Sequence, residues 1–580
     1  QMAQSDEPLF RLLPPESTNV NFQNTVTDKK EHNILMYSNY YGGGGVGVGD
    51  FNKDGLPDLF FAGNLVADEI YFNLGDLKFQ QANVAAGITD NGGWSSGVVI
   101  ADINNDGWDD IYVTRELYDD QPDLRKNLLY INTGKMFDLG NGKKGVRFEE
   151  KAAEYGLDNS ERTRHAGFLD YDNDGWLDLF LLNQPPNPGN YSDFYGTNLM
   201  QEKWAPRLLR NNTNGTFTDV TKQAGILIPG YANSMVATDV NKDGWTDIFL
   251  TNDYESPDRL YLNNGDGTFK DILQAQINHT SFYAMGVDAA DINNDGWQDV
   301  MTLDMVAEDN FRLKANMSGM NPQAFFDVVN NGGHYQYMFN ALHLNNDGKN
   351  FSDIAQMTGM SNTDWSWSNL IADFDNDGWK DVFVTNGLLR DIRNSDAAKT
   401  FPKYVRKTIN EFIEKNPNAG EVHIFDILDL DKALDLLPSV PLQNYIYKNN
   451  GDLTFSKKIE AWGLEEETFS NGSAYADLDN DGDLDLIINN INAPAFIYEN
   501  QSSNLNRNNW IEVQLIDNQT HTPLYGSKIS IELANGAQQF WELTNVRGMY
   551  STSENIAHFG LGKTNRIKAI SIILPNGKKD

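Results

Sequence analysis

The sequence predicts an all-β fold: a seven-bladed β-propeller with calcium-binding hairpin loops, helical inserts and a small C-terminal β domain. Two observations predict it. Short apolar runs alternate with glycine-rich turns along most of the chain. A nine-residue pattern, Asp-x-Asp/Asn-x-Asp-Gly-x-x-Asp, also recurs without a defect, starting at Asp50, Asp102, Asp170, Asp239, Asp291, Asp373 and Asp477. Repetition of one supersecondary unit is typical of propellers and solenoids.

The composition excludes several classes of function. The chain has 580 residues and a formal net charge of −37. Nucleic acid is not an expected partner, because its phosphates require Lys and Arg. No cysteine is present, so there is no disulfide framework. No run of about 20 apolar residues predicts a membrane span. Since much of the acidity lies inside the repeated pattern, we expect cations as partners.

The first two strands of each unit flank the repeated pattern. The strand before it is rich in small residues, which suits a crowded position at the central axis, and the strand after it is apolar. Short apolar, β-branched runs between turn residues are typical of buried strands. The first strands are expected at 47–49, 97–101, 166–169, 235–237, 285–287, 370–372 and 474–476. The second strands are expected at 59–61, 111–113, 179–181, 248–250, 300–303, 382–384 and 486–488.

Two more strands complete each unit. The third ends in Asn and is expected at 70–73, 129–132, 208–211, 260–263, 342–345, 445–449 and 496–500. A Gly turn leads to a fourth strand that starts with Phe79, Phe148, Phe217, Phe269, Phe351 or Phe455. Only six fourth strands follow the turns. We therefore expect an N-terminal strand, at 9–22, to complete the last blade, as propellers commonly close. The propeller then covers residues 9–503.

Long inserts interrupt the repeat mainly between the second and third strands, at about 183–206, 304–340 and 387–443. Strand direction alternates, so these inserts should share one face, while the metal loops and Gly turns share the other. The last insert contains an apolar stripe with helical spacing: Phe401, Tyr404, Val405, Ile409, Phe412 and Ile413. We favour a helix packed on the disc, and the alternative is a partner-binding helix.

Different patterns flank the repeats. Residues 1–8 are polar and are expected to form an N-terminal tether. Because Gln1 is not a natural start, we expect that a leader has been removed. Three stretches alternate from residue 508 on, at 510–515, 528–533 and 567–574, and no metal pattern occurs there. We predict a small, separate β domain over 508–580, whose last strand suggests that the natural chain continues.

The repeated pattern predicts calcium sites. Calcium takes six to eight oxygen ligands, and acidic side chains at alternate positions converge if the chain wraps around the ion, helped by the Gly at position six. The closing acid comes at position nine, earlier than in EF-hands. Magnesium prefers a rigid octahedron, and zinc prefers Cys and His. The alternative is that each repeated loop is an Asx-rich hairpin turn that binds no metal, but its clustered carboxylates would then repel one another.

Up to seven calcium ions are expected, and each site has five predicted ligands. Positions one, three, five and nine supply side chains, and position seven supplies its carbonyl oxygen. The third, sixth and seventh sites carry four carboxylates and are predicted to bind most tightly. The ligands are Asp50, Asn52, Asp54, Leu56 and Asp58; Asp102, Asn104, Asp106, Trp108 and Asp110; Asp170, Asp172, Asp174, Trp176 and Asp178; Asp239, Asn241, Asp243, Trp245 and Asp247; Asp291, Asn293, Asp295, Trp297 and Asp299; Asp373, Asp375, Asp377, Trp379 and Asp381; and Asp477, Asp479, Asp481, Asp483 and Asp485.

Other motifs are assigned to structure. Residues 93–97 match the Gly-x-Ser-x-Gly elbow of hydrolases, but they enter a predicted first strand, where no strand-to-helix turn is expected. The glycines at 42–45 lack the Lys of a phosphate loop. The Trp residues at position seven are expected to pack between blades rather than to serve as sugar platforms. His165 and His334 are expected to be structural.

These motifs resemble known families. The seven units are similar to FG-GAP/VCBS repeats, as in the propeller of integrin α subunits. Gly526-Ser527-Lys528-Ile529, Arg547-Gly548, residues 558–562 and residues 574–577 resemble an ASPIC/UnbV domain. Together they look like CRTAC-type surface proteins, and the opening through Gly43 is similar to surface lipoproteins of Bacteroidota. That resemblance implies a lipidated cysteine before Gln1, which would anchor the protein to the membrane. It also implies that the protein lies at the cell surface or outer membrane, or is secreted.

The resemblance implies a binding or assembly protein rather than an enzyme. We expect a non-enzymatic, calcium-binding propeller whose insert-bearing face binds a protein, plausibly of an outer-membrane complex, or a glycan. No catalytic residue and no organic cofactor is predicted. The alternative is a polysaccharide-processing, lyase-like enzyme, because some lyases resemble this architecture. Its candidate residues in the inserts are His334, Tyr335, Arg390 and Arg393, whose spacing specifies no site.

Overall fold

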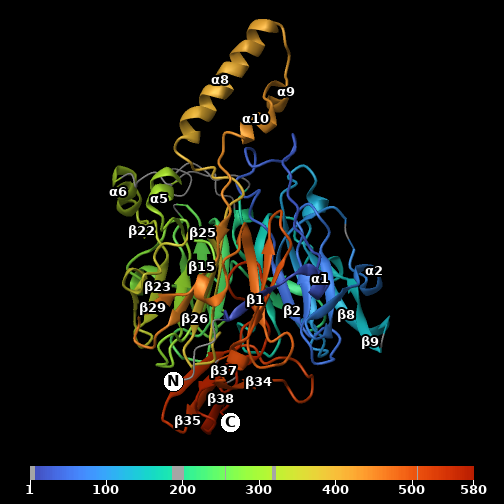
Figure 1. Cartoon of the computed structure of the whole chain (residues 1–580), viewed down its shortest axis with the longest axis vertical. Coiled ribbons are helices and arrows are strands. Elements are labelled where there is room, and N and C mark those ends of the chain that lie inside the picture. The colour runs from blue at the N-terminus through green and yellow to red at the C-terminus, as the bar shows by residue number, and fades with distance from the viewer. Residues whose placement is uncertain are drawn as a thin grey trace.

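The computed structural model describes residues 7–89, 91–140, 142–185, 202–254, 256–316, 322–505, 507–575 and 577–579. Figure 1 shows a disc of sheets with helices projecting from one face and a smaller β domain on the other. No helix in these ranges combines the length and apolar character that a membrane crossing needs. The predicted tether falls largely outside these ranges, as does most of the insert at 183–206.

Seven antiparallel sheets of four or five strands make up the disc in the described residues. The first three are β2 (Val46–Gly49), β3 (Asp58–Phe61), β4 (Glu69–Gly75) and β5 (Lys78–Gln81); β6 (Trp94–Ala101), β7 (Asp110–Glu116), β8 (Leu128–Gly140) and β9 (Lys143–Glu150); and β10 (Thr163–Leu169), β11 (Asp178–Asn183), β12 (Arg207–Asn211) and β13 (Phe217–Asp219). The next two are β14 (Ala232–Thr238), β15 (Asp247–Asn252), β16 (Arg259–Asn263) and β17 (Phe269–Asp271); and β19 (Val287–Ala290), β20 (Asp299–Thr302), β23 (Ala341–Asn345) and β24 (Phe351–Asp353).

The sixth sheet contains β21 (Met305–Val306), β25 (Asp364–Ala372), β26 (Asp381–Asn386), β28 (Tyr445–Asn449) and β29 (Phe455–Lys457). The seventh contains β31 (Ser470–Ala476), β32 (Asp485–Asn490), β33 (Phe496–Asn500) and the N-terminal β1 (Phe10–Leu13). Pairing of Phe10 with Asn500 closes the last sheet, as the sequence predicts. The N-terminal strand is shorter than predicted, because Pro14 and Pro15 lead into α1 (Pro15–Thr18).

The sheets form a closed ring. The first strands contact one another in the order β2, β6, β10, β14, β19, β25 and β31, and β31 contacts β2 again. Small residues allow this approach at the axis: a Cβ added to Gly47 would lie 2.7 Å from Val98 and Ile100 side-chain atoms. Apolar cores fill the spaces between neighbouring sheets. The chain is thus a β-propeller whose core is divided among its blade interfaces.

Helices on the insert-bearing face include α5 (Asn310–Asn316) and α6 (Pro322–Asn330). The last insert forms α8 (Ala397–Lys415), α9 (Ile424–Ile427) and α10 (Leu430–Leu434). The helix predicted at 401–415 is present, but the expectation that it packs on the disc is wrong. In Figure 1, α8 projects away from the disc, and its half-buried apolar side packs toward α9. We call residues 396–436 the arm.

The C-terminal domain contains β34 (Asn509–Val513), β35 (Lys528–Leu533), β36 (Gln538–Glu542), β37 (Ala557–Gly562) and β38 (Ile567–Ile573). The expectation that it is separate is wrong, because Ile529, Trp541 and Phe559 share one core with propeller residues such as Phe374 and Leu486. Residues 546–552, which we call the plug, leave this domain and enter the axis. There Val48 and Val98 donate backbone hydrogen bonds of 3.0 and 2.7 Å to plug carbonyls.

Candidate metal centres and the insert-bearing face

Each repeated loop is wrapped around its first Asp. In the first loop, Asp50 accepts hydrogen bonds from the backbone N–H groups of Asp54 (3.0 Å) and Gly55 (2.9 Å). The same pair of bonds is present in all seven loops. Gly55 has a φ of +83°, a conformation that favours glycine. The Gly at position six is therefore needed for the turn that gathers the carboxylates.

The Asp at position nine connects each metal loop to the sheet of its blade through hydrogen bonds. Asp58, at the start of β3, accepts from the N–H of Phe51 (3.1 Å) and of Asn73 (2.7 Å). The equivalent Asp does so in every blade. These aspartates are buried. A predicted ligand at the start of the second strand thus also joins the metal loop to the third strand of its blade.

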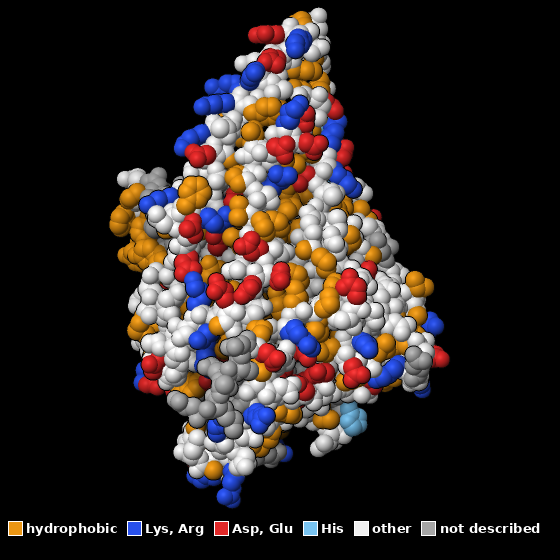
Figure 2. All heavy atoms as spheres, in the orientation of Figure 1, with side chains coloured by type: hydrophobic (Ala, Val, Ile, Leu, Met, Phe, Trp, Pro, Cys, Tyr) orange, Lys and Arg blue, Asp and Glu red, His pale blue; other side chains and the backbone are white. Residues whose placement is uncertain are grey.

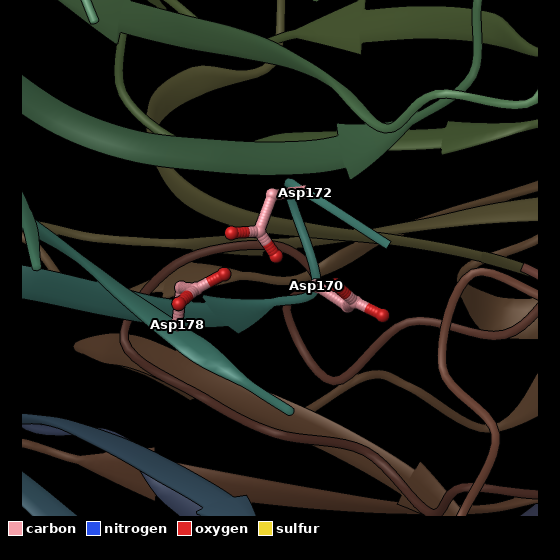
Figure 3. Close-up of side chains that lie close together, drawn as sticks. All are labelled: Asp170, Asp172 and Asp178. Atoms are coloured by element: carbon pink, nitrogen blue, oxygen red, sulfur yellow. The ribbon is translucent and has the colours of Figure 1, made fainter. Parts of the chain in front are cut away.

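Three loops bring acidic oxygens close enough to hold a metal ion. In each, three carboxylate oxygens lie within 4.8 Å of one another: Asp170, Asp172 and Asp178; Asp373, Asp375 and Asp381; and Asp477, Asp479 and Asp481. Figure 3 shows the first group, where a loop meets the start of β11. These are the loops whose sequences offer four carboxylates. The carbonyl groups assigned as ligands at position seven have no contact that tests them, so their role stays a prediction.

Burial and mutual repulsion raise the pKa values of carboxyl groups in the metal loops. Burial raises the pKa of Asp170 to about 7, and Asp172 and Asp174 add to the shift. The pKa of Asp247 rises to about 8 and that of Asp477 to about 7, again mainly through burial. Without a cation, such groups hold protons near neutral pH. A divalent ion would displace those protons, so metal binding should strengthen as pH rises.

Lysine side chains enter two of the loops. Lys448 from β28 contacts Asp375 and lies 2.5 Å from Asp377 in the sixth loop. Lys528 of the C-terminal domain lies 2.7 Å from Asp239 in the fourth loop and 3.9 Å from Glu542. An ammonium group beside a predicted ligand competes with a metal ion for the same oxygen. The number of carboxylates alone therefore does not determine the relative affinities.

The fourth residue of each loop links it to the next blade. Asn105 donates to the carbonyl of Gly175 (3.1 Å), and Asn480 closes the ring by donating to Gly55 (2.8 Å). Three other Asn side chains make the equivalent bond. Lys53 and Lys242 instead lie over the Trp of the next loop. This ring was not predicted from the sequence, although Asn or Lys at position four of every copy was a visible signal.

The Asn that ends each third strand forms a second ring. Asn132 donates from its side chain to the carbonyl of Phe51 in the preceding loop (2.9 Å), and the six other blades repeat the bond. The Trp at position seven lies against the Gly turn of its own blade in four cases; a Cβ added at Gly134 would lie 3.2 Å from Trp108. Gly turns, Asn residues and metal loops therefore form one continuous face.

An aromatic cluster lies where loops converge on the insert-bearing side of the axis. Tyr231, Tyr254 and Tyr283 pack edge to face in a row, with ring centroids 5.1 and 5.9 Å apart. Arg393, from the last insert, lies 4.2 Å from the Tyr283 ring and donates to its hydroxyl (2.8 Å). Burial raises the pKa of Tyr283. Side chains from the fourth, fifth and sixth blades thus meet in one polar, aromatic surface.

Buried ionic groups lie deeper on the axis. Arg164 is fully buried, pairs with Glu116 (2.9 Å) and lies 5.0 Å from the Tyr550 ring of the plug. Tyr37 donates to Glu116 (2.5 Å). His165 is buried beside Tyr550, and burial with the nearby Arg164 charge lowers its pKa to about 3. A neutral buried imidazole fits the structural role expected for it.

The candidate lyase residues do not meet in one cluster: His334 contacts Tyr335, with ring centroids 6.4 Å apart, whereas Arg390 and Arg393 contact other residues. His334 is buried and receives its electrostatic interactions from Ile277, His279 and Asp271, whereas Arg393 contacts Tyr283 and Tyr254. Arg390 donates to the carbonyl of Leu434 at the base of the arm. Ser95 of the elbow-like motif lies inside β6 and bonds Asp68. Its position in a strand explains the motif.

Comparison with known proteins gives two family matches. The family model of the FG-GAP-like repeat matches residues 50–113, 170–250, 239–302 and 428–488. The family model named ASPIC and UnbV matches residues 517–580. Cartilage acidic protein 1 of Xenopus tropicalis is 23% identical over 595 residues, covering 99% of this chain and 75% of that protein. The Homo sapiens protein of the same name is 23% identical over 553 residues, covering 92% and 69%.

Two solved structures share low similarity. An Agrocybe aegerita lectin, described as recognising non-reducing terminal N-acetylglucosamine, has a TM-score of 0.36 and 16% identity over 77% of this chain and 88% of that one. The exotype rhamnogalacturonan lyase YesX has a TM-score of 0.36 and 12% identity over 80% of this chain and 72% of that one.

Proposed function

Because the chain is an FG-GAP-repeat protein with a C-terminal ASPIC and UnbV domain, homologous to cartilage acidic protein 1, we propose that it is a calcium-stabilised, non-enzymatic binding protein. Its insert-bearing face binds a protein or glycan partner. The supporting observation is the contrast between the two faces. The metal-loop face repeats the same hydrogen bonds blade after blade, whereas the opposite face carries connections of unequal length, among them the inserts at 304–340 and 387–443.

Calcium is the ion that best fits the loops. The predicted ligands are all oxygens, three of the loops gather three carboxylates within 4.8 Å, and the wrapped backbone resembles a calcium loop. Each ion would join the first and second strands of a blade at their hairpin. Extracellular calcium modules typically bind with Kd of roughly 10⁻⁴–10⁻³ M, so permanent loading requires a calcium-rich exterior.

The arm and the neighbouring helices supply the binding surface. Phe311 and Phe326 on α5 and α6 are 75% and 54% exposed, and Ile413 on α8 is 57% exposed. Figure 2 shows Lys and Arg side chains interspersed with Asp and Glu along the arm, beside apolar patches. Exposed aromatic and aliphatic side chains next to charges are typical of interaction sites. Helix α8 carries five Lys or Arg residues and two Glu residues, so a partner with acidic groups complements this helix best.

Binding without catalysis agrees with the chemistry of the aromatic cluster. A lyase base would require a phenolate or neutral His beside an exposed substrate site. Burial raises the pKa of Tyr283, which disfavours its phenolate, and His334 is buried. Incubation with a panel of polysaccharides, followed by ultraviolet absorbance of unsaturated products, tests this part; product formation would contradict it.

We propose a location outside the cytoplasm, either secreted or held at the cell surface by an N-terminal lipid anchor. An outer-membrane complex is then a suitable protein partner. The support is the calcium binding proposed above for the loops, together with the resemblance to surface lipoproteins. Protease treatment of intact cells should remove the protein if it is exposed at the surface, and full protection would argue against this location.

Charge reversal on the arm tests the binding face. The variant carries Lys403→Glu, Arg406→Glu and Lys407→Glu, three exposed α8 residues. We expect affinity capture followed by mass spectrometry to lose a partner that wild type retains. The matched control reverses Lys78, Lys222 and Lys270, which are exposed on the blades. Equal partner recovery with both variants would contradict binding through the arm.

A further inference from the structure

A cavity of about 440 Å³ lies on the metal-loop face, away from the binding surface proposed above. One wall comes from the second and third metal loops, including Asn105 and Trp176. The other wall comes from residues 517–525 of the C-terminal domain and from Leu574 and Pro575. The repeats alone would not enclose this space, so the cavity exists because the two domains dock.

The lining is aromatic and acidic. Trp176, Leu524 and Pro575 supply apolar surface, and the four carboxylates are Asp102, Asp170, Asp174 and Asp517. No Lys or Arg belongs to the residues described as lining it. An anionic ligand would meet only repulsion. The negative charge of the loops persists with calcium bound. The second loop supplies three Asp ligands and the third supplies four, so one Ca²⁺ in each loop leaves net charges of −1 and −2.

Two other loops show what such a wall binds. Lys53, at position four of the first loop, places its ammonium 4.1 Å from the centre of the Trp108 ring in the next loop. Lys242 places its ammonium 3.8 Å from the Trp297 ring. Each ammonium also interacts with carboxylates beside that Trp, Asp102 for Lys53 and Asp291 for Lys242. A cation between an indole face and a carboxylate is favourable.

The third loop has the same wall without the lysine. Asn105 occupies position four of the preceding loop, with a φ of +55° that matches the +57° of Lys53. Its short side chain bonds the carbonyl of Gly175, and the cavity opens beside Trp176. We propose that this cavity binds an organic cation, a primary ammonium or a guanidinium group, against Trp176. The cation comes either from a free amine or from a Lys or Arg side chain.

The proposal is tested by calorimetric titration of the calcium-saturated full chain with cadaverine. The neutral probe of the same length is 1,5-pentanediol. We expect cadaverine to bind and the diol not to bind. Trp176→Leu should weaken cadaverine binding about tenfold, because the cation–π contact is lost. The matched control is Trp204→Leu, since Trp204 is partly exposed, lies outside the metal loops and does not line the cavity; its affinity should equal that of wild type.

A second variant fills the cavity from within. Asn105→Lys recreates the Lys53 and Lys242 arrangement, so we expect cadaverine binding to disappear while the thermal unfolding midpoint stays at or above that of wild type. A capped Gly-Lys-Gly peptide that binds more tightly than cadaverine identifies a partner's side chain as the source, and the reverse order identifies a free amine. Equal binding of diol and cadaverine, or undiminished cadaverine binding by Asn105→Lys, would overturn the proposal.

Discussion

Lys448 changes the meaning of the carboxylate count in the sixth loop. By sequence, this loop ranks with the tightest calcium sites, because Asp373, Asp375, Asp377 and Asp381 all carry charge. The ammonium of Lys448 contacts Asp375 and Asp377. A calcium ion must first displace it, and hydrogen bonds to charged groups contribute about 1.5–3 kcal/mol each. We therefore expect the seventh loop to bind calcium more tightly than the sixth.

Lys448→Met should tighten calcium binding at the sixth loop by about tenfold or more, because one competing charge-assisted hydrogen bond is lost. Calorimetric calcium titration of the variant measures the change. Lys349→Met is the control, since Lys349 is exposed and reaches only Asp347 in its own turn. Identical isotherms for wild type and Lys448→Met would show that the ammonium does not compete.

His165 makes stability depend on pH. Its folded pKa is lowered to about 3 by burial and Arg164, from an ordinary value of 6.5. The unfolded chain takes up a proton below pH 6.5 and the folded chain does not, so stability is complete above 6.5 and is lost as pH falls toward 3. At pH 5 the loss from this group is about 2 kcal/mol.

His165→Leu should remove that loss. In saturating calcium, wild type should lose about 2 kcal/mol more unfolding free energy than the variant between pH 7.5 and pH 5. Urea unfolding at both pH values measures the difference. Parallel losses in the two proteins would mean that His165 is protonated in the folded state.

Among the elements, the plug explains Gly45, the last residue of the glycine run at 42–45. A Cβ added at Gly45 would lie 1.9 Å from the carbonyl oxygen of Tyr550. The N-terminal segment and the plug therefore pass each other backbone to backbone at the axis. Gly45 therefore allows two segments more than 500 residues apart in sequence to approach closely.

Gly45→Ala should destabilise the protein by several kcal/mol, or displace the plug, because overpacking in a close-packed interior typically costs about 1–3 kcal/mol and here the neighbour is backbone. Thermal unfolding measures the effect. Gly420→Ala is the matched control, since nothing lies within 4 Å of a Cβ there, and its midpoint should change little. A tolerated Gly45→Ala would show that the plug is not held at the axis.

Sequence reasoning worked best for elements whose pattern is local. The four strands of each blade follow from short apolar runs, and the loops follow from residue types within nine positions. It failed where distant segments meet. The plug carries no repeat, and its contacts with Val48 and Val98 span about 450 residues or more. The apolar stripe of α8 can be buried against α9 as well as against the disc. The sequence therefore could not predict that α8 projects away from the disc.

At the scale of the whole molecule, the metal loops lie in a ring of contacts that links every blade to the next. Loosening one loop therefore weakens its hold on the neighbouring blade. If calcium holds the loops, its binding free energy adds to the stability of the folded ring through linkage. The docked C-terminal domain should share in this stabilisation.

Chelation with EDTA should lower the thermal unfolding midpoint, by roughly 2–4 °C for each kcal/mol of lost binding free energy in a domain of 150–250 residues and by less in a larger unit. Calorimetry with and without EDTA measures it, and restoring excess calcium is the control for reversibility. An unchanged midpoint would contradict the structural role of calcium.

The pairing of β1 with β33 also sets an order of events during synthesis. Arg11 bonds Glu499, 488 residues away. A chain that emerges N-terminus first has made six complete blades before the partner of its first strand exists. Until then, its first strand has no sheet to join and the ring stays open. Because contacts of such high sequence separation form slowly, the ring can close only after nearly the whole chain is made, and the nascent protein spends its synthesis in an open form.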